Sequence, residues 1–247
     1  KINALDSSYS KKKFLNYLLD LSTSTEATTT EPVTTEPPVT TPYIVPGIDV
    51  SRWQETIDWN QVKASGMDFA IIRAGYGRLV EQEDGNFRVN IQGAKAAGLN
   101  CGVYWYSYAL TPEDAIVEAQ ACLSVIKGYK FEYPIFFDIE ESSQRALGKD
   151  TVSAIINAFC STVESQGYYV GIYSCKSFLV DCVNNDILNR YDVWIAQWNN
   201  EVTYTGPYGI WQYTSEGMVN GINGRVDLNI SYKNYPEIMK TYHLNGY

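Results

Sequence analysis

The sequence predicts an α/β protein whose main domain is an irregular TIM-like β/α barrel with fewer helices than strands. From Gly47 onward, a short apolar strand followed by an amphipathic helix recurs about five times, and this alternation with short connections indicates a parallel sheet. Three more strands follow with little helix between them. The region has about 200 residues, whereas a complete eightfold barrel typically has about 250. Missing helices account for the difference.

Apolar runs bounded by turn residues predict eight strands, and helical periodicity predicts five helices. The strands are expected near residues 47–51, 68–76, 100–108, 134–140, 169–175, 192–198, 208–214 and 224–230. The helices are expected over residues 57–65, 86–97, 112–127, 150–166 and 177–189. A glycine follows each of the first four helices, where a left-handed cap is favoured: Gly66, Gly98, Gly128 and Gly167. Thr111 and Pro112 supply an N-cap and a first helical residue for the third helix.

Composition divides the chain into four segments. Residues 22–46 hold five of the nine prolines among repeated threonines and no Lys or Arg, so they predict a disordered linker with polyproline character. Residues 1–21 contain a short helical pattern and are interpreted as the remnant of an upstream segment. The barrel is expected over residues 47–232, and residues 233–247 are expected to be a C-terminal tail. Thr/Pro linkers join modules of secreted or surface-attached proteins, which predicts an extracellular or cell-wall location.

Charge and hydropathy disfavour several classes of partner. The net charge of −9 and the pI of about 4.7 disfavour nucleic acid and anionic membrane surfaces. No apolar run approaches the roughly 20 residues of a membrane span. We therefore expect no interaction with nucleic acid or membrane, and the protein is also expected to be a monomer.

The counts of histidine and cysteine also limit the chemistry. The single histidine, His243, is the fifth residue from the C-terminus, which disfavours Ser-His-Asp, Cys-His and His-based zinc sites. Five cysteines show no C-x-x-C pattern, and a Cys175–Cys182 bridge is left open. Neither a metal nor an organic cofactor is expected.

The most informative stretch is Tyr133–Glu140, an apolar strand that ends in two carboxylates. Asp138 and Glu140 leave the same side of this strand, because side chains alternate along it. Two acids at the mouth of an apolar strand are costly unless they are used. Paired carboxylates carry out glycoside cleavage, in which one acid holds a proton while its neighbour stays charged. The alternative is an ordinary strand end with two solvated acids.

The same alternation rule selects two more acids. Asp49 faces inward between the outward-facing Ile48 and Val50, and Asp227 faces inward between Val226 and Leu228. Active sites of β/α barrels lie at the C-terminal ends of the strands. Three distant strands thus deliver four acids by one rule, which favours a site built on carboxylates.

Aromatic and amide side chains are expected around these acids. Aromatic rings offer apolar faces to sugars, and amides offer hydrogen bonds to hydroxyl and acetamido groups. Any one of these side chains alone is more typical of a core, so the group carries the prediction. The candidate substrate-binding residues are Tyr76, Tyr104, Tyr106, Tyr173, Trp194, Gln197, Trp198 and Gln212.

Residues 47 to about 232 resemble the glycoside hydrolase family 25 lysozymes, which are N-acetylmuramidases of peptidoglycan. The matching segments are Gly47–Ser51 with Trp53-Gln54 and Ile57–Trp59, then Gly102–Tyr108, Phe137–Glu140, Trp194–Trp198, Trp211–Tyr213 and Gly221–Asn229. One departure is Glu55-Thr56 after Trp53-Gln54, where members often have glycine. This departure changes a loop near the groove.

The resemblance implies roles for the four acids. Glu140 corresponds to the general acid/base and Asp138 to the assisting carboxylate, whereas Asp49 and Asp227 correspond to acids that line the site floor. The substrate would be the β-1,4 bond between N-acetylmuramic acid and N-acetylglucosamine in peptidoglycan glycan strands. Attack by the substrate acetamido oxygen is favoured, and inversion by an activated water is the rival. A non-catalytic glycan-binding module and a chitinase-like hydrolase are the alternative functions.

Overall fold

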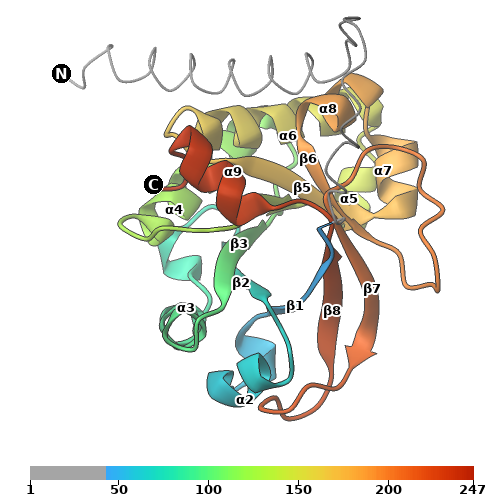
Figure 1. The fold of residues 1–247 in the computed structure, drawn as a ribbon. Coiled ribbons are helices and arrows are strands. Elements are labelled where there is room, and N and C mark those ends of the chain that lie inside the picture. The colour runs from blue at the N-terminus through green and yellow to red at the C-terminus, as the bar shows by residue number, and fades with distance from the viewer. Residues whose placement is uncertain (1–42) are drawn as a thin grey trace, which may run out of the picture.

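The computed structural model describes residues 43–247, so the predicted segment 1–21 and most of the predicted linker lie outside the described residues. Eight strands form a closed barrel in chain order, which confirms the predicted barrel (Figure 1). The strands are β1 (Val45–Val50), β2 (Phe69–Tyr76), β3 (Asn100–Tyr106), β4 (Ile135–Asp138), β5 (Val170–Cys175), β6 (Asp192–Ala196), β7 (Ile210–Gly217) and β8 (Val226–Ser231).

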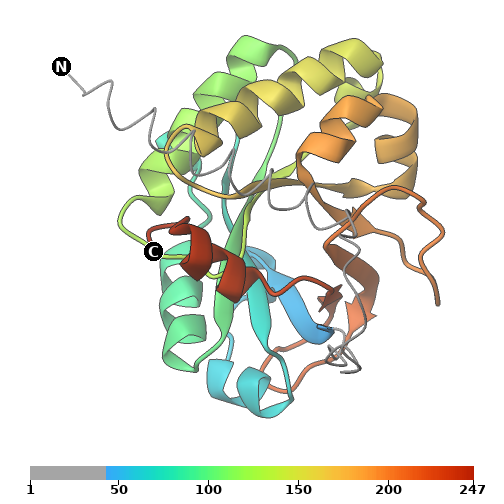
Figure 2. The ribbon, with the colours of Figure 1, turned by 45° about the horizontal axis from the view of Figure 1, so that its top comes forward.

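Helices cover the outside of the first six strands and are missing between β6, β7 and β8. The long helices α4 and α6 pack side by side on the outer face of the barrel (Figure 2). The α-helices are α2 (Trp59–Ala64), α3 (Phe87–Ala96), α4 (Pro112–Ile126), α5 (Ser142–Arg145), α6 (Lys149–Glu164), α7 (Lys176–Cys182), α8 (Asn185–Arg190) and α9 (Tyr235–Tyr242). Two 3₁₀ turns, η1 (Arg52–Gln54) and η2 (Val80–Gln82), follow β1 and β2.

The last strand runs against the others, so the predicted parallel arrangement does not extend to β8. It pairs antiparallel with both β7 and β1, whereas the other neighbouring strands are parallel. Parallel neighbours need a crossover connection of about a dozen residues or more, and the connection after β7 is a short loop without a helix. The chain therefore returns directly, as in a hairpin.

Several element boundaries differ from the predicted ones by a few residues, and β4 and β6 end at Asp138 and Ala196, two residues before their predicted ends. Two further differences concern the linker and the last predicted helix. Val45 and Pro46, expected in the linker, belong to β1, where Pro46 is the register partner of Ile230. The single helix expected over residues 177–189 is two helices, α7 and α8. The break lies at Asn184, whose backbone N–H donates to Ser153 Oγ at 2.9 Å.

The segment after residue 232, expected as a tail, contains helix α9. Its N-cap Asn234 accepts from the backbone of Glu237, and Tyr235 and Met239 are fully buried. They pack with Phe69 and Tyr133 inside the barrel. Phe69 begins β2, so α9 closes the end of the barrel that faces away from the C-terminal ends of the parallel strands.

Two apolar layers hold the fold. One lies between the strands and the outer helices and includes Ile48, Val50 and Phe137, which confirms that these residues face away from the barrel axis. The other fills the barrel interior, and its members are Phe69, Ile71, Tyr133, Phe136, Tyr169, Trp194, Ile210, Tyr235, Met239 and Leu244. Gly47 makes room for this interior, because a Cβ there would lie 2.4 Å from the Phe69 ring.

The predicted caps are present. Gly66, Gly98, Gly128 and Gly167 all have positive φ, between 81° and 91°, after their helices, and the Thr111 hydroxyl accepts from the backbone of Asp114. Cys175 and Cys182 are free thiols, so no bridge joins them. Within residues 43–247, no helix has the length and apolar character needed to span a membrane.

Candidate active site

Strand geometry brings the four predicted acids to one rim of the barrel. Asp138 ends β4, Glu140 follows it by two residues, and Asp49 lies near the end of β1. Asp227 lies at the start of β8 and reaches this rim only because β8 is antiparallel. It is the register partner of Asp49. Alternation along the strand predicted that Asp227 faces inward. The reversed direction of β8 explains why a residue at the start of this strand lies at the same rim as the other acids.

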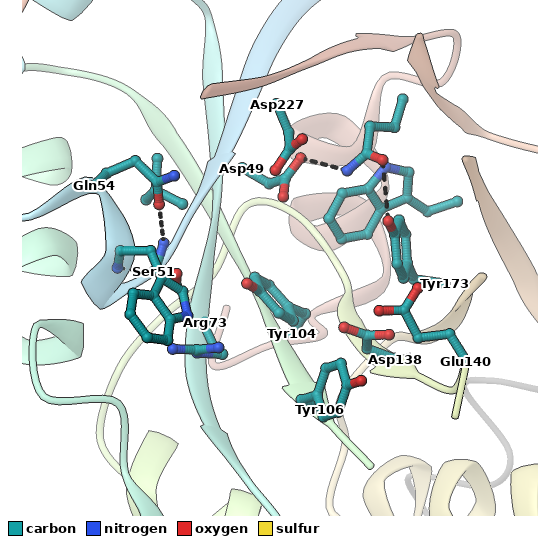
Figure 3. Close-up of a pocket in the computed structure, with 14 residues that line it drawn as sticks. Asp49, Ser51, Gln54, Arg73, Tyr104, Tyr106, Asp138, Glu140, Tyr173 and Asp227 are labelled. Atoms are coloured by element: carbon teal, nitrogen blue, oxygen red, sulfur yellow. Dashed lines mark hydrogen bonds between the residues drawn. The ribbon is translucent and has the colours of Figure 1, made fainter. Parts of the chain in front are cut away.

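The acids form two pairs on opposite walls of a cavity of about 230 Å³ (Figure 3). Asp49 and Asp227 lie together on one wall, and Asp138 and Glu140 lie together on the other. Strand β8 stands opposite β4 in an eight-stranded barrel closed in chain order, and β1 is its neighbour, which explains this arrangement. The cavity therefore presents carboxylates to both sides of a bound group.

Asp49 is the most firmly anchored acid. Its Oδ2 accepts hydrogen bonds from Gln212 Nε2 at 2.9 Å and from Asn229 Nδ2 at 2.8 Å. Asn229 is itself fixed, because its Oδ1 accepts from Trp194 Nε1 at 2.8 Å. Burial and the adjacent Asp227 raise the pKa of Asp49 well above its ordinary value, and burial raises the pKa of Asp227 to about 6. These two carboxyl groups therefore hold one proton between them more readily than two charges.

Asp138 and Glu140 share a strand end but have different surroundings. Asp138 is only 4% exposed, and its Oδ1 is buried without a hydrogen-bond partner in the part of the chain that is described. Burial and the charges of Glu140 and Asp49 raise its pKa well above the ordinary value. Glu140 is exposed at the mouth of the cavity, and partial burial followed by the charge of Glu141 raises its pKa. A group entering the cavity meets Glu140 first and Asp138 beneath it.

Four aromatic residues predicted to bind substrate line the cavity, namely Tyr104, Tyr106, Tyr173 and Trp194. Gln212, also predicted, lines the same cavity. It connects the two walls, since its Oε1 accepts from Tyr173 OH at 3.0 Å while its Nε2 donates to Asp49. Trp194 packs edge-on against Tyr104, which holds both rings in place.

Three predicted substrate-binding residues lie outside the cavity lining. Gln197 is turned toward the β6–β7 loop, where its Nε2 donates to Thr203 Oγ1 at 2.8 Å. Tyr76 lies at the end of β2 against Tyr108. Trp198 is 60% exposed beside the cavity and reaches it only through Gln212, because its Nε1 donates to Gln212 Oε1 at 3.0 Å. The alternation of side chains along a strand does not predict the direction of a side chain at or beyond the end of that strand.

Other lining residues were not predicted as site residues. Ser51 and Gln54 form a capping box around η1, a Ser-x-x-Gln pattern that the sequence contains. Trp53, between them, also lines the cavity. Arg73 lines it from β2. The sequence contained a signal for this position, because Arg73 is a charged residue in an otherwise apolar strand. It lies two positions after Ile71 and therefore faces the same inward side.

Within residues 43–247, no group of three or more His, Cys, Asp or Glu side chains is arranged to hold a metal ion. The lining instead combines four carboxyl groups with aromatic faces and amides. This set of groups suits proton transfer to and from a neutral, hydroxyl-rich ligand.

A β/α barrel with raised-pKa carboxyl groups and aromatic walls at one rim is the architecture of carboxylate-dependent glycoside hydrolases. The family model of glycosyl hydrolases family 25 matches residues 48–222. The chain belongs to this family.

Known relatives agree with this assignment. An autolytic lysozyme of Clostridium acetobutylicum is 30% identical over 187 residues, covering 74% of this chain and 54% of the relative. Lysozyme M1 of Streptomyces globisporus is 31% identical over 202 residues, covering 75% and 67%. The modular autolysin LytC of Streptococcus pneumoniae, solved in complex with a synthetic peptidoglycan ligand, superposes with a TM-score of 0.69 at 33% identity, covering 76% and 47%. The chain thus spans about half the length of two of these proteins.

Proposed function

We propose that this protein is a peptidoglycan hydrolase that cleaves the β-1,4 bond between N-acetylmuramic acid and N-acetylglucosamine. The observation that carries the proposal is the placement of the two acids at the end of β4, with Glu140 open at the cavity mouth and Asp138 buried beneath it. Membership of glycosyl hydrolases family 25 and the lysozymes among its relatives support the substrate class. Action on cell walls from outside the cell, as a monomer, is part of the same proposal.

Glu140 acts as the general acid and then as the general base. Its raised pKa favours the protonated form, which gives its proton to the glycosidic oxygen as the bond to the anomeric carbon breaks. The same carboxylate then takes a proton from the water that attacks the anomeric carbon. Its exposed position at the mouth suits both steps.

Asp138 assists the substrate acetamido group. The acetamido oxygen attacks the anomeric carbon as the leaving group departs, and positive charge develops on the acetamido nitrogen. The Asp138 carboxylate stabilises this charge from below, and the absence of a hydrogen bond to its Oδ1 within residues 43–247 leaves that atom available. Asp49 and Asp227 line the opposite wall, where they hold and orient the sugar.

The rival pathway is inversion, in which Asp138 or another of the acids activates a water molecule directly. Proton NMR of the first product distinguishes the two pathways. The assisted pathway retains the β configuration, so a β-anomer is expected first. An α-anomer appearing first would eliminate substrate assistance while leaving the hydrolase function intact.

The identity of the new reducing end tests the substrate assignment. Purified peptidoglycan is digested and the reducing-end sugar is identified by mass spectrometry, and we expect muramic acid. Glucosamine at that position would show a glucosaminidase, and cleavage of chitin oligomers in preference to peptidoglycan would favour a chitinase-like enzyme. Binding to peptidoglycan without any new reducing ends would show a non-catalytic glycan-binding module.

A further inference from the structure

One charged side chain in the cavity has no part in the roles proposed above. Arg73 is the only Lys or Arg among the lining residues of the described chain, and it faces four carboxyl groups there. It lies on the inward side of β2, and its register partner on β3 is Tyr104, which lines the same cavity. Figure 3 shows Arg73, Tyr104 and the four acids around one space. A single cation among so many acids strongly affects which of them can be ionised.

Arg73 is held in place by a buried ion pair. Its Nε donates to Asp84 Oδ2 at 2.6 Å, and the side chains of Arg73 and Asp84 are 12% and 0% exposed. Asp84 is fixed in turn, because it accepts from the backbone N–H groups of Arg52 and Asn86. The guanidinium Nη2 is buried and makes no hydrogen bond within residues 43–247. Arg73 therefore has a defined position without using all of its donors.

Apart from Arg73, the titratable groups around Asp138 are carboxyl groups and phenols, which carry negative charge or none. Glu140 and Asp49 raise the pKa of Asp138 in addition to burial, and Arg73 is the charge that lowers it. The titratable and charged groups around Asp138 and Arg73 come from every neighbouring element, and they are Asp49, Arg73, Asp84, Tyr104, Tyr106, Glu140, Glu141, Tyr173 and Asp227. Arg73 is the only cation in this set.

We propose that Arg73, anchored by Asp84, is a positioning residue whose fixed positive charge favours the carboxylate form of Asp138 while Glu140 holds the catalytic proton. The inference rests on the proposed role of Asp138 and adds the device that separates the protonation states of the two neighbouring acids. Two acids on one strand end can work as acid and anion only when their surroundings differ. Arg73 supplies that difference from β2.

The test removes the charge without leaving a buried acid unpaired. In the double variant Arg73→Met/Asp84→Asn the ion pair is replaced by neutral groups, and the introduced amide keeps one oxygen, which can accept from one of the two backbone donors, Arg52 or Asn86. The pKa of Asp138 then rises, so its carboxylate is lost at a higher pH. We expect the acidic limb of the kcat/KM profile on peptidoglycan to move up by about one pH unit. Arg73→Lys should keep the limb near that of the parent.

A matched control and a direct measurement separate this effect from a structural one. Arg78→Met removes an exposed arginine just past the same strand, where it pairs with Asp114, and should leave the profile unchanged. Carboxyl ¹³C NMR identifies Asp138 as the signal missing from Asp138→Asn, and this signal should titrate at a higher pH in the double variant.

The two measurements distinguish the role of Arg73 from the hydrolase activity itself. A folded double variant with an unchanged Asp138 titration and an unchanged acidic limb would overturn the role of Arg73, even if the parent releases muramic acid ends. A parent that releases no such ends would overturn the proposed function, whereas the NMR titration would still report on Arg73.

Discussion

At the scale of single residues, the site depends on acids placed where acids are costly. Asp138 is almost completely buried with one oxygen unpaired in the described structure, and Asp49 has equally little exposure. Each has a raised pKa because burial disfavours its charge, and neighbouring acids add to that cost. Glu140 differs only in being open to the cavity mouth. Burial alone would favour the proton on Asp138, so the proposed role of Glu140 as proton donor rests on its exposed position at the cavity mouth, where a glycosidic oxygen can reach it.

Replacement of Glu140 tests the residue-scale assignment. Glu140→Gln keeps the size and hydrogen bonding of the side chain but removes the transferable proton, so lysis of cell walls should fall by about 10³-fold or more. Binding to peptidoglycan should change little. Rates of turbidity loss and pull-down on insoluble peptidoglycan measure the two properties.

The neighbouring residue provides the control. Glu141 is also a carboxylate, but its Oε1 accepts from Tyr106 OH at 2.8 Å and it does not line the cavity. Glu141→Gln should therefore reduce lysis far less than Glu140→Gln. Retained lysis in Glu140→Gln would show that another group is the acid.

At the scale of elements, two features of the C-terminal part complete the barrel. The reversal of β8 brings Asp227 and Asn229 to the rim beside Asp49. Helix α9 then closes the opposite end. The Asp192 carboxylate at the start of β6 ties that end together, since its Oδ2 accepts from Tyr169 OH, Tyr235 OH and Lys233 Nζ at about 3 Å. Separate elements thus build the two ends of the barrel.

Asp192 should therefore matter for stability and not for chemistry. Asp192→Ala removes an acceptor shared by two buried phenols and an ammonium group, and should lower the free energy of unfolding by about 3 kcal/mol. Urea denaturation measures this loss. Glu201→Ala, an exposed site, should change it by less than about 0.5 kcal/mol. Equal effects of the two changes would show that α9 is not anchored through Asp192.

At the scale of the whole molecule, the buried carboxyl groups of the site lower the stability of the folded barrel. A carboxyl group whose pKa is higher in the folded protein binds its proton more tightly there than in the unfolded chain. Stability is therefore lost as the pH rises from the unfolded pKa to the folded one. For Asp227 this interval extends from 3.8 to about 6, so the full cost is present at neutral pH. The apolar layers inside and outside the barrel offset it.

This cost leads to a prediction for overall stability. Asp227→Asn removes the charge that the folded state disfavours, and a pKa difference of about two units corresponds to at most about 3 kcal/mol. The variant should unfold at a higher temperature than the parent at pH 7, with little lysis. Below about pH 4 the two proteins should unfold alike. A variant less stable than the parent at pH 7 would show that the Asp227 carboxylate is stabilising.

Much of the fold could be predicted because its signals are local. The strands follow from apolar runs, the helix ends follow from residues such as Gly98 and Thr111, and the inward parity of Asp49 and Asp138 follows from alternation along a strand. Errors occurred where a side chain or an element depends on distant partners. Gln197 turns toward a loop, and α9 is stabilised by Tyr235 and Met239 in a barrel end that no local pattern reveals.

The sequence by itself determined the barrel, the missing helices of its last third and the inward face of each acid, because these follow from periodicity along single elements. Only the tertiary structure decided that β8 runs backward, that the acids form two facing pairs and that Arg73 lies among them. The physical reason is that direction, distance and charge balance arise between elements. The pKa of a carboxyl group changes only when the folded chain excludes water from it and places other charged groups next to it.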